Sequence, residues 1–221
     1  ICFINKLDRM GASFERSFQS ILDRLTKHAV RMQIPVGEEE NFEGVIDLLT
    51  MKYYTFEGDM GSKIVSHEIP AEHLDDAKKY RGELIEAIVE NDEDLMNQYL
   101  EGKEPALADL KRVLRKATIE NKIIPVFAGS ALKNKGVQLV LDGVVDYLPS
   151  PLEIPPTKGH DPKTDEEIFR HADDKEPFSA LAFKIATDPY VGQLAFFRVY
   201  SGTLEAGSYV YNATKGKKER I

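Results

Sequence analysis

Two short runs of consecutive apolar residues stand out in the chain, Ile1–Ile4 and Ile123–Phe127. Continuous apolar runs of this length are typical of strands that are buried on both faces of a parallel sheet. A polar loop follows each run, and after it apolar residues recur every three or four positions, as in an amphipathic helix. These helices are predicted at Ala12–Ala29 and Gly136–Tyr147. The pattern therefore predicts an α/β fold in which the two runs pair in parallel.

An insertion separates the two runs. A strand–helix–strand unit takes roughly 30 residues, whereas these strands lie about 120 residues apart, so roughly 90 residues are inserted. Four strand-like segments come first in the insertion: Met32–Val36, Glu43–Leu49, Met51–Phe56 and Lys63–Ile69. Helical patterns follow at Ala71–Glu90, at Leu95–Leu100 and after Pro105. We therefore predict an α/β subdomain at residues 31–116, inserted into a domain that residues 1–30 and 117–150 form.

A different architecture is predicted for the last third of the chain. The prolines within Pro149–Pro156 stiffen the backbone, and a polar stretch that reads as a loop follows, so residues 151–176 are predicted as a linker. Alternating segments bounded by glycines then predict strands at Phe178–Ile185 and Gln193–Tyr200. Residues 177–221 are therefore predicted to begin an antiparallel β-barrel.

The net charge of −8 is unevenly distributed along the chain. The stretch from Gly37 to Leu110 holds 20 acidic and 6 basic residues, whereas the remainder holds 17 acidic and 23 basic residues. A solvated surface is the simple interpretation of the acidic stretch. The alternative is a surface that repels RNA and attracts a basic protein partner.

Composition argues against several classes of protein. No apolar run approaches the roughly 20 residues that cross a bilayer, so we predict no membrane partner, and no DNA partner is predicted either. The single cysteine, Cys2, cannot form an internal disulfide and fits a reduced, cytoplasmic setting. The five histidines show no metal-ligand spacing, so no metal site is predicted.

The loop after the first apolar run reads Asn5-Lys6-Leu7-Asp8. It follows the end of a predicted strand, where ligands bind in open α/β sheets. The Asp8 carboxylate would accept hydrogen bonds from the ring N–H and the exocyclic amine of guanine, a pair of donors that adenine lacks. Asn5 would hold the loop and approach the base edge, and the aliphatic stem of Lys6 would cover the base. An ordinary polar loop between strand and helix is the alternative.

The loop after the second apolar run reads Gly129-Ser130-Ala131-Leu132. Its small residues would let the backbone come close to a planar base, and the N–H of Ala131 would donate to the guanine carbonyl oxygen. Because the two loops follow paired parallel strands, we predict that they are neighbours. Lys133 and Lys135 flank this loop and are interpreted as solvated.

Longer motifs resemble the elongation factor G family of translational GTPases. The matching stretches cover essentially the whole chain: Asn5–Ala12, Gly129–Gln138, Asp146–Pro151, Glu176–Lys184, Thr187–Gly192 and Phe197–Gly202. The resemblance implies the C-terminal part of a P-loop GTPase domain with an inserted subdomain, followed by the start of a second, β-barrel domain. It also implies binding of GTP or GDP, with Mg²⁺ in the intact protein, and GTP hydrolysis that drives translocation of tRNA and mRNA. Ribosomal RNA and a ribosomal stalk protein are the implied partners.

The resemblance assigns base recognition, but no catalysis, to this sequence. The residues assigned to the nucleotide are Asn5, Lys6, Leu7, Asp8, Ser130, Ala131 and Leu132. No Gly-x-x-x-x-Gly-Lys-Ser/Thr phosphate loop and no Mg²⁺ ligand can be assigned, and Asp8-Arg9-Met10-Gly11 matches an Asp-x-x-Gly switch by letters only. The sequence starts four residues before the first loop, so we expect a preceding part and expect this piece alone to be inactive. A binding module without enzymatic activity and a sister ribosome-protection GTPase are the alternatives.

Overall fold

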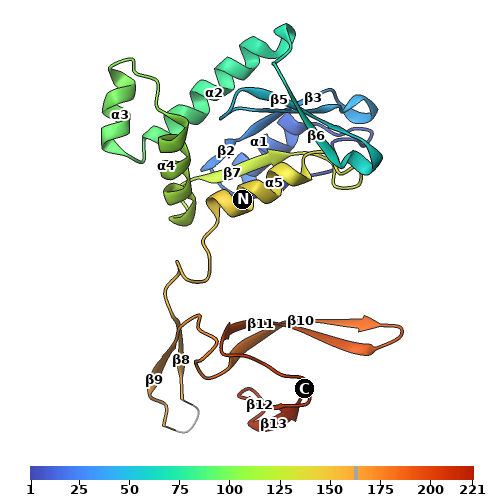
Figure 1. Cartoon of the computed structure of the whole chain (residues 1–221), viewed down its shortest axis with the longest axis vertical. Coiled ribbons are helices and arrows are strands. Elements are labelled where there is room, and N and C mark those ends of the chain that lie inside the picture. The colour runs from blue at the N-terminus through green and yellow to red at the C-terminus, as the bar shows by residue number, and fades with distance from the viewer. Residues whose placement is uncertain (162–163) are drawn as a thin grey trace. The chain divides into compact units, whose positions relative to one another are not determined.

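The computed structural model describes residues 1–161 and 164–221 (Figure 1). The chain divides into two compact units, Ile1–Leu148 and Pro149–Ile221. Each unit has its own sheets, and the two candidate loops both belong to the first unit.

A three-stranded parallel sheet lies at the centre of the first unit. Its strands are β1 (Cys2–Ile4), β7 (Ile124–Ala128) and β2 (Ala29–Arg31), in the order β1-β7-β2. Cys2 pairs with Val126 in parallel register, which confirms the predicted pairing of the two apolar runs. The strand β2 was not predicted, because three residues are too few to show a pattern.

Two helices cover this sheet, one between β1 and β2 and one after β7. Helix α1 spans Phe14–Arg24 and begins after Ser13, whose hydroxyl accepts a hydrogen bond from the N–H of Arg16 at 3.3 Å. The predicted helix at Ala12–Ala29 is therefore too long at its C-terminal end, where the chain turns into β2. Helix α5 spans Val137–Tyr147, close to its predicted bounds.

The insertion begins with a four-stranded antiparallel sheet. The strands occur in chain order and are β3 (Gln33–Val36), β4 (Gly44–Asp47), β5 (Lys52–Glu57) and β6 (Lys63–His67). Each overlaps a predicted strand, so the prediction of four strands is confirmed; β3, β4 and β6 are shorter than predicted, and β5 is shifted by one residue. Two single turns of 3-10 helix join them, η1 (Glu39–Asn41) and η2 (Asp59–Gly61).

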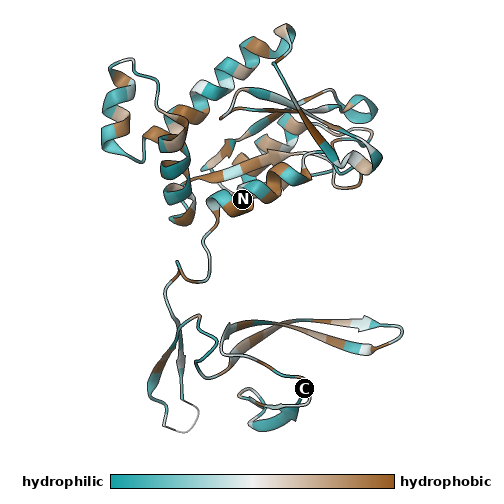
Figure 2. Cartoon of the chain, viewed as in Figure 1, coloured by the Kyte–Doolittle hydropathy of each residue, from teal (hydrophilic) through white to brown (hydrophobic). Residues whose placement is uncertain are grey.

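Three α-helices follow this sheet, in the predicted order. A further 3-10 turn, η3 (Ala71–His73), leads into α2 (Leu74–Val89), and α3 (Glu93–Leu100) and α4 (Leu107–Ile119) come next. Brown, apolar bands alternate with teal, hydrophilic bands along these helices in Figure 2, as expected of amphipathic helices. The chain thus places strands first and helices second within the insertion, as predicted.

One hydrophobic core joins the insertion to the central sheet. The cluster includes Ile46 of β4, Ile88 of α2 and Leu114 of α4, together with Phe127 of β7 and Tyr147 of α5. Of these, Ile46, Ile88 and Leu114 have no exposed surface. The insertion therefore packs as a continuation of the domain that carries it.

The second unit contains three antiparallel pairs of strands. They are β8 (Thr157–His160) with β9 (Glu167–Arg170), β10 (Ser179–Asp188) with β11 (Gly192–Ser201), and β12 (Tyr209–Asn212) with β13 (Lys217–Arg220). The β10–β11 pair confirms the two strands predicted there. The interpretation of Lys158–Glu176 as a loop is wrong where β8 and β9 form, because strands of four residues rich in charge lack a clear apolar alternation.

Two helical glycines give a matched test of packing in the first unit. Alanine is favoured over glycine inside a helix by about 0.5–1 kcal/mol. A Cβ at Gly82 in α2 would meet nothing within 4 Å among the described residues, so Gly82→Ala should stabilise the fold by about that amount. A Cβ at Gly143 in α5 would lie 2.4 Å from the Phe127 ring, so Gly143→Ala should destabilise it by about 1–3 kcal/mol. Urea unfolding of both variants measures the difference, and a shift of the same sign in both would contradict the packing at Gly143.

Candidate functional site

The two candidate loops lie side by side at one edge of the central sheet. Because β1 and β7 are parallel neighbours, the loops that follow them leave the sheet at the same edge. The N–H of Gly129 donates to the Ile4 carbonyl at 3.1 Å, and the N–H of Leu7 donates to the Gly129 carbonyl at 3.2 Å. These backbone bonds join the loops directly, which confirms the prediction that the two loops are neighbours.

The Asn5 side chain bridges the two loops. Its Oδ1 accepts hydrogen bonds from the N–H of Lys6 at 2.7 Å and from the N–H of Ala131 at 2.9 Å. Lys6 has a φ of 66°, a left-handed conformation that a residue with a Cβ rarely adopts, and the bond from Asn5 supports it. The predicted role of Asn5 in holding the loop therefore has a direct structural basis. The N–H of Ala131, expected to point to a ligand, bonds to Asn5 here.

Asp8 is the acidic group of the site. Its carboxyl is half-buried and receives a hydrogen bond from Ser130, which is fully buried, and this bond holds the pKa of Asp8 below its usual value of 3.8. The positive charges of Arg9 and Lys133 lower this pKa further. Asp8 is therefore ionised at neutral pH. Its Oδ1 has no accessible surface and no hydrogen-bond partner within the described part of the chain.

Leu7 and Leu132 have different surroundings within these loops. Leu7 is only 5% exposed and packs in a second core cluster with Ile4 and Phe14. This packing anchors the first loop at the residue between Lys6 and Asp8. Leu132 is 63% exposed at the tip of the second loop. Only the first of these two leucines has a clear structural role in placing the site.

The second loop is a tight turn closed by its own backbone. Ser130 and Lys135 exchange two backbone hydrogen bonds, of 2.8 and 3.0 Å. A Cβ at Gly129 would lie 2.3 Å from the Lys135 carbonyl oxygen, and a Cβ at Gly136, whose φ is 85°, would lie 2.4 Å from the Ala128 carbonyl oxygen. Both glycines are thus required by the turn itself, in addition to any approach of a ligand.

The interpretation of Lys135 as a solvated lysine is wrong. Its Nζ donates to the Phe42 carbonyl at 2.5 Å and lies 5.7 Å from the centre of the Phe42 ring. The contact crosses 93 positions of sequence, so no local pattern points to it. Lys133 is exposed, in agreement with its interpretation.

Removing the Ser130 hydroxyl should move the titration of Asp8. In Ser130→Ala the pKa of Asp8 should rise toward 3.8, because the hydrogen bond that favours the carboxylate is lost. A depressed folded pKa adds stability above the unfolded pKa, and this stability disappears as the pH falls through the folded value. The free energies of unfolding of wild type and variant should therefore differ at neutral pH and converge in acid. A carboxyl NMR titration of Asp8 tests this, and an unchanged pKa in the variant would contradict it.

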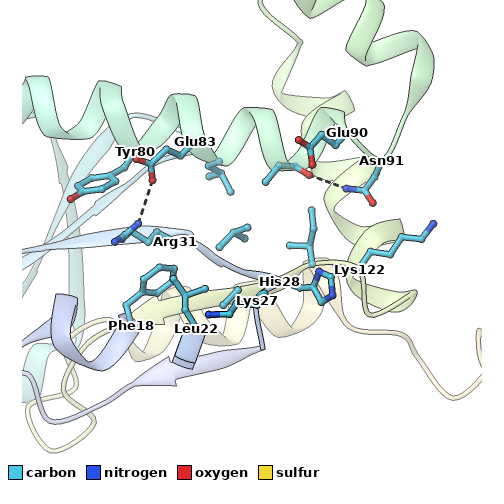
Figure 3. A pocket seen from close by; sticks show the side chains of 15 residues that line it. Phe18, Leu22, Lys27, His28, Arg31, Tyr80, Glu83, Glu90, Asn91 and Lys122 are labelled. Atoms are coloured by element: carbon cyan, nitrogen blue, oxygen red, sulfur yellow. Dashed lines mark hydrogen bonds and ion pairs between the residues drawn. The ribbon is translucent and has the colours of Figure 1, made fainter. Parts of the chain in front are cut away.

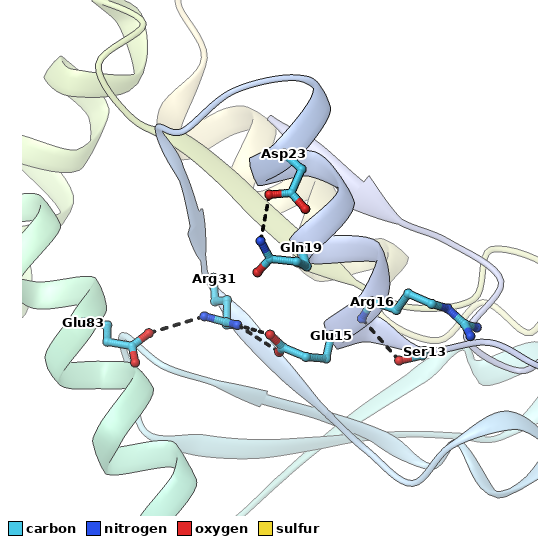
Figure 4. A network of polar contacts seen from close by, with 7 residues as sticks. All are labelled: Ser13, Glu15, Arg16, Gln19, Asp23, Arg31 and Glu83. Atoms are coloured by element: carbon cyan, nitrogen blue, oxygen red, sulfur yellow. Dashed lines mark hydrogen bonds and ion pairs between the residues drawn. The ribbon is translucent and has the colours of Figure 1, made fainter.

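A second polar cluster lies away from the two loops and centres on Arg31. Its Nη2 contacts both carboxylate oxygens of Glu15 in α1 at 2.7 and 2.8 Å, and its Nη1 contacts Glu83 in α2 at 3.3 Å (Figure 4). The guanidinium also lies over the rings of Phe18 and Tyr80. Arg31 therefore ties α1, β2 and α2 together, a role that sequence reasoning missed.

A cleft of about 550 Å³ adjoins this cluster (Figure 3). Phe18, Leu22 and Lys27 lie together along one side of it, and His28 and Lys122 lie at the end away from Arg31. Ile123 directly precedes β7, so this part of the cleft lies at the opposite end of β7 from the second loop, which follows Ala128. The cleft therefore lies in a different part of the fold from the two candidate loops, and no sequence pattern predicted it.

In the part of the chain that the structure describes, none of the helices combines the length and apolarity needed to cross a bilayer. Across residues 1–161 and 164–221, no three His, Cys, Asp or Glu side chains gather where they would hold a metal ion.

The arrangement suits recognition of a planar base that carries adjacent N–H donors. The half-buried Asp8 carboxylate is ionised, and the Asn5 side chain holds the two loops together beside it, so the carboxylate offers an acceptor at a fixed place. The residues present therefore fit the base half of a guanine nucleotide.

Comparisons with known proteins agree with this fold. Residues 1–150 match the model of the elongation factor Tu GTP-binding domain, and residues 177–221 match that of elongation factor G domain 2. A crystal structure of a protein from Thermus thermophilus is similar with a TM-score of 0.69 and 26% sequence identity. The similarity covers 99% of this chain and 29% of that one, so the chain spans under a third of the length of its structural relative.

Proposed function

Because this chain belongs to the elongation factor family of GTP-binding domains, we propose that its two loops recognise the guanine base of GTP or GDP. The observation that carries the proposal is the Asp8 carboxylate, ionised at neutral pH, beside the buried Ser130 and the Asn5 bridge. Guanine presents two adjacent donors to such a group, its ring N–H and its exocyclic amine. Adenine does not, so the site would discriminate between the bases.

Each residue of the site has a separate task in this proposal. Asp8 would accept both guanine donors, and Asn5 would keep the two loops in register while it approaches the base edge. The stem of Lys6 would cover one face of the base. Ser130 would orient Asp8, and the N–H of Ala131 would lie near the guanine carbonyl oxygen. Leu132 would lie at the margin of the base site.

The parent protein is proposed to be an elongation factor G, a cytoplasmic GTP hydrolase that drives movement of tRNA and mRNA on the ribosome. The match to elongation factor G domain 2 supports this choice within the family. The bound nucleotide supplies the phosphoanhydride bond whose hydrolysis releases free energy. Phosphate and Mg²⁺ contacts would come from other parts of the parent protein, because the sequence has no phosphate loop. The piece by itself would not hydrolyse GTP.

Two ribosomal partners are proposed for the rest of the chain. The acidic stretch from Gly37 to Leu110, with 20 acidic and 6 basic residues, suits a basic face of a ribosomal stalk protein. The second unit is proposed to contact ribosomal RNA. Its Lys217, Lys218 and Arg220 all lie on β13 and would meet phosphates there.

Base selectivity tests the proposed site directly. The parent protein that carries this segment should be titrated with GDP, with inosine diphosphate, which lacks the exocyclic amine, and with ADP. Loss of one hydrogen bond to a charged group costs about 1.5–3 kcal/mol, so inosine diphosphate should bind about one to two decades more weakly than GDP. ADP should bind more weakly still. Equal affinities for GDP and ADP would overturn the proposal.

A further inference from the structure

We infer that the insertion positions the two base-binding loops, through contacts from β3, η1 and η2. The inference rests on the proposed guanine site and adds residues to it that no motif contains. Four contacts carry it, and each joins the insertion to a base loop or to the backbone that leads into or out of one. They link segments that lie 28 to 95 positions apart in the sequence.

The first contact supports the strand that leads into the second loop. Gln33 of β3 has no exposed surface, and its Oε1 accepts a hydrogen bond from the N–H of Ala128 at 3.2 Å. Ala128 is the last residue of β7 and directly precedes Gly129. A buried backbone N–H needs a partner, so Gln33 fixes the point at which the second loop leaves the sheet.

The second contact holds the end of the first loop. Glu39 of η1 is half-buried, and its Oε1 accepts a hydrogen bond from the N–H of Gly11 at 2.7 Å. The Gly11 carbonyl in turn accepts a hydrogen bond from Arg16 of α1. Gly11 lies three residues after Asp8, so Glu39 and Arg16 together restrain the backbone that follows the acidic group of the site.

The third and fourth contacts hold the second loop and the helix that follows it. Lys135 donates to the Phe42 carbonyl, just after η1, at 2.5 Å. Gln138 of α5 donates through Nε2 to the carbonyl of Gly61 in η2 at 3.0 Å. Gly61 is buried, and a Cβ there would lie 2.9 Å from the Lys133 carbonyl oxygen. The insertion thus touches the second loop by both hydrogen bonds and close packing.

These contacts give the insertion control over base affinity. The site recognises guanine through Asp8 and Asn5, whose placement depends on the loops, and small displacements of a hydrogen-bonding group weaken selection strongly. Coupling of this kind is reciprocal, so a change at the insertion alters base affinity and base binding alters the insertion by the same factor. Glu39 and Lys135 are accordingly positioning residues. They join the insertion to the loops, and neither is one of the residues assigned to the base.

The test compares variants that remove the contacts at and just after η1 in the full parent protein. Glu39→Ala and Lys135→Met should each weaken GDP binding about three- to thirtyfold and reduce the preference for GDP over inosine diphosphate. Glu39→Gln retains an acceptor oxygen and should restore most of the affinity. Glu40→Ala is the matched control, because Glu40 is exposed on the same turn and has no hydrogen bond to either loop within the described residues. It should leave both quantities unchanged.

The possible outcomes separate the inference from the proposed function. If the wild type does not prefer GDP to ADP, the proposed function fails. If the wild type prefers GDP but Glu39→Ala and Lys135→Met retain full affinity and base preference, the positioning inference fails. It also fails if these variants lose GDP and inosine diphosphate equally while their unfolding midpoints fall, since that pattern describes a general loss of structure. A selective loss of base preference at an unchanged midpoint supports it.

Discussion

Replacing Asp8 with asparagine should weaken GDP binding by about two to four decades, because two hydrogen bonds to a charged acceptor are lost at about 1.5–3 kcal/mol each. The NH2 group of the asparagine would face the guanine amine, where the wild-type carboxylate presents an acceptor oxygen. Xanthine carries a carbonyl oxygen in place of that amine. Xanthosine diphosphate should therefore bind Asp8→Asn better than it binds the wild type. Competition binding with both nucleotides measures the exchange of preference.

The control for this prediction is Asp23→Asn. Asp23 lies on α1, where it accepts a hydrogen bond from Gln19 and pairs with Lys27, and it belongs to neither base loop. The same change of charge there should leave both affinities unaltered. A loss of GDP binding in Asp8→Asn without any gain for xanthosine diphosphate would show that Asp8 supports the loop and does not read the base.

Replacing Leu114 with alanine should lower the free energy of unfolding of the first unit by about 2–5 kcal/mol. Leu114 of α4 has no exposed surface and packs in the core that the insertion shares with β7 and α5. The five α-helices within the described residues all belong to the first unit, so loss of the circular dichroism signal of helices follows its unfolding. Because the core is continuous, the whole helical signal should shift in one transition.

Leu141→Ala provides the control for this prediction. Leu141 lies on α5 and is 58% exposed, so its truncation should change the free energy of unfolding by about 0.5 kcal/mol or less. If Leu114→Ala split the helical signal into two transitions, with one at the wild-type midpoint, the insertion would unfold independently. The shared core would then contribute little to cooperativity.

Much of the first unit was predictable because its patterns are local. The consecutive apolar residues of Ile1–Ile4 and Ile123–Phe127 predicted two buried parallel strands, and their pairing then placed the two loops together. The strand β2 escaped prediction because it has only three residues and because the helix predicted at Ala12–Ala29 extended into its first residue. The hairpin of β8 and β9 escaped because its alternate positions are mostly polar or charged.

The site was predictable only in part, for a physical reason. Asp8, Asn5 and Ser130 lie within short motifs whose chemistry can be read directly. Glu39 and Gln33 reach the loops through the tertiary fold, and each is one polar residue in a segment that gives no hint of its partner. Lys135 shows the same limit, since a lysine beside a loop is ordinarily solvated.

The junction between β2 and β3 bears on how this protein could be shortened. Only Met32 separates the last residue of β2 from Gln33, so the chain passes from the central sheet into the insertion without a flexible segment. Excising residues 33–116 and closing the gap would remove the acceptor for the Ala128 N–H and strip the apolar cover from β7. A minimal guanine-binding unit therefore cannot be obtained by cutting out the insertion. Any smaller version would need a redesigned strand edge and a new partner for Ala128.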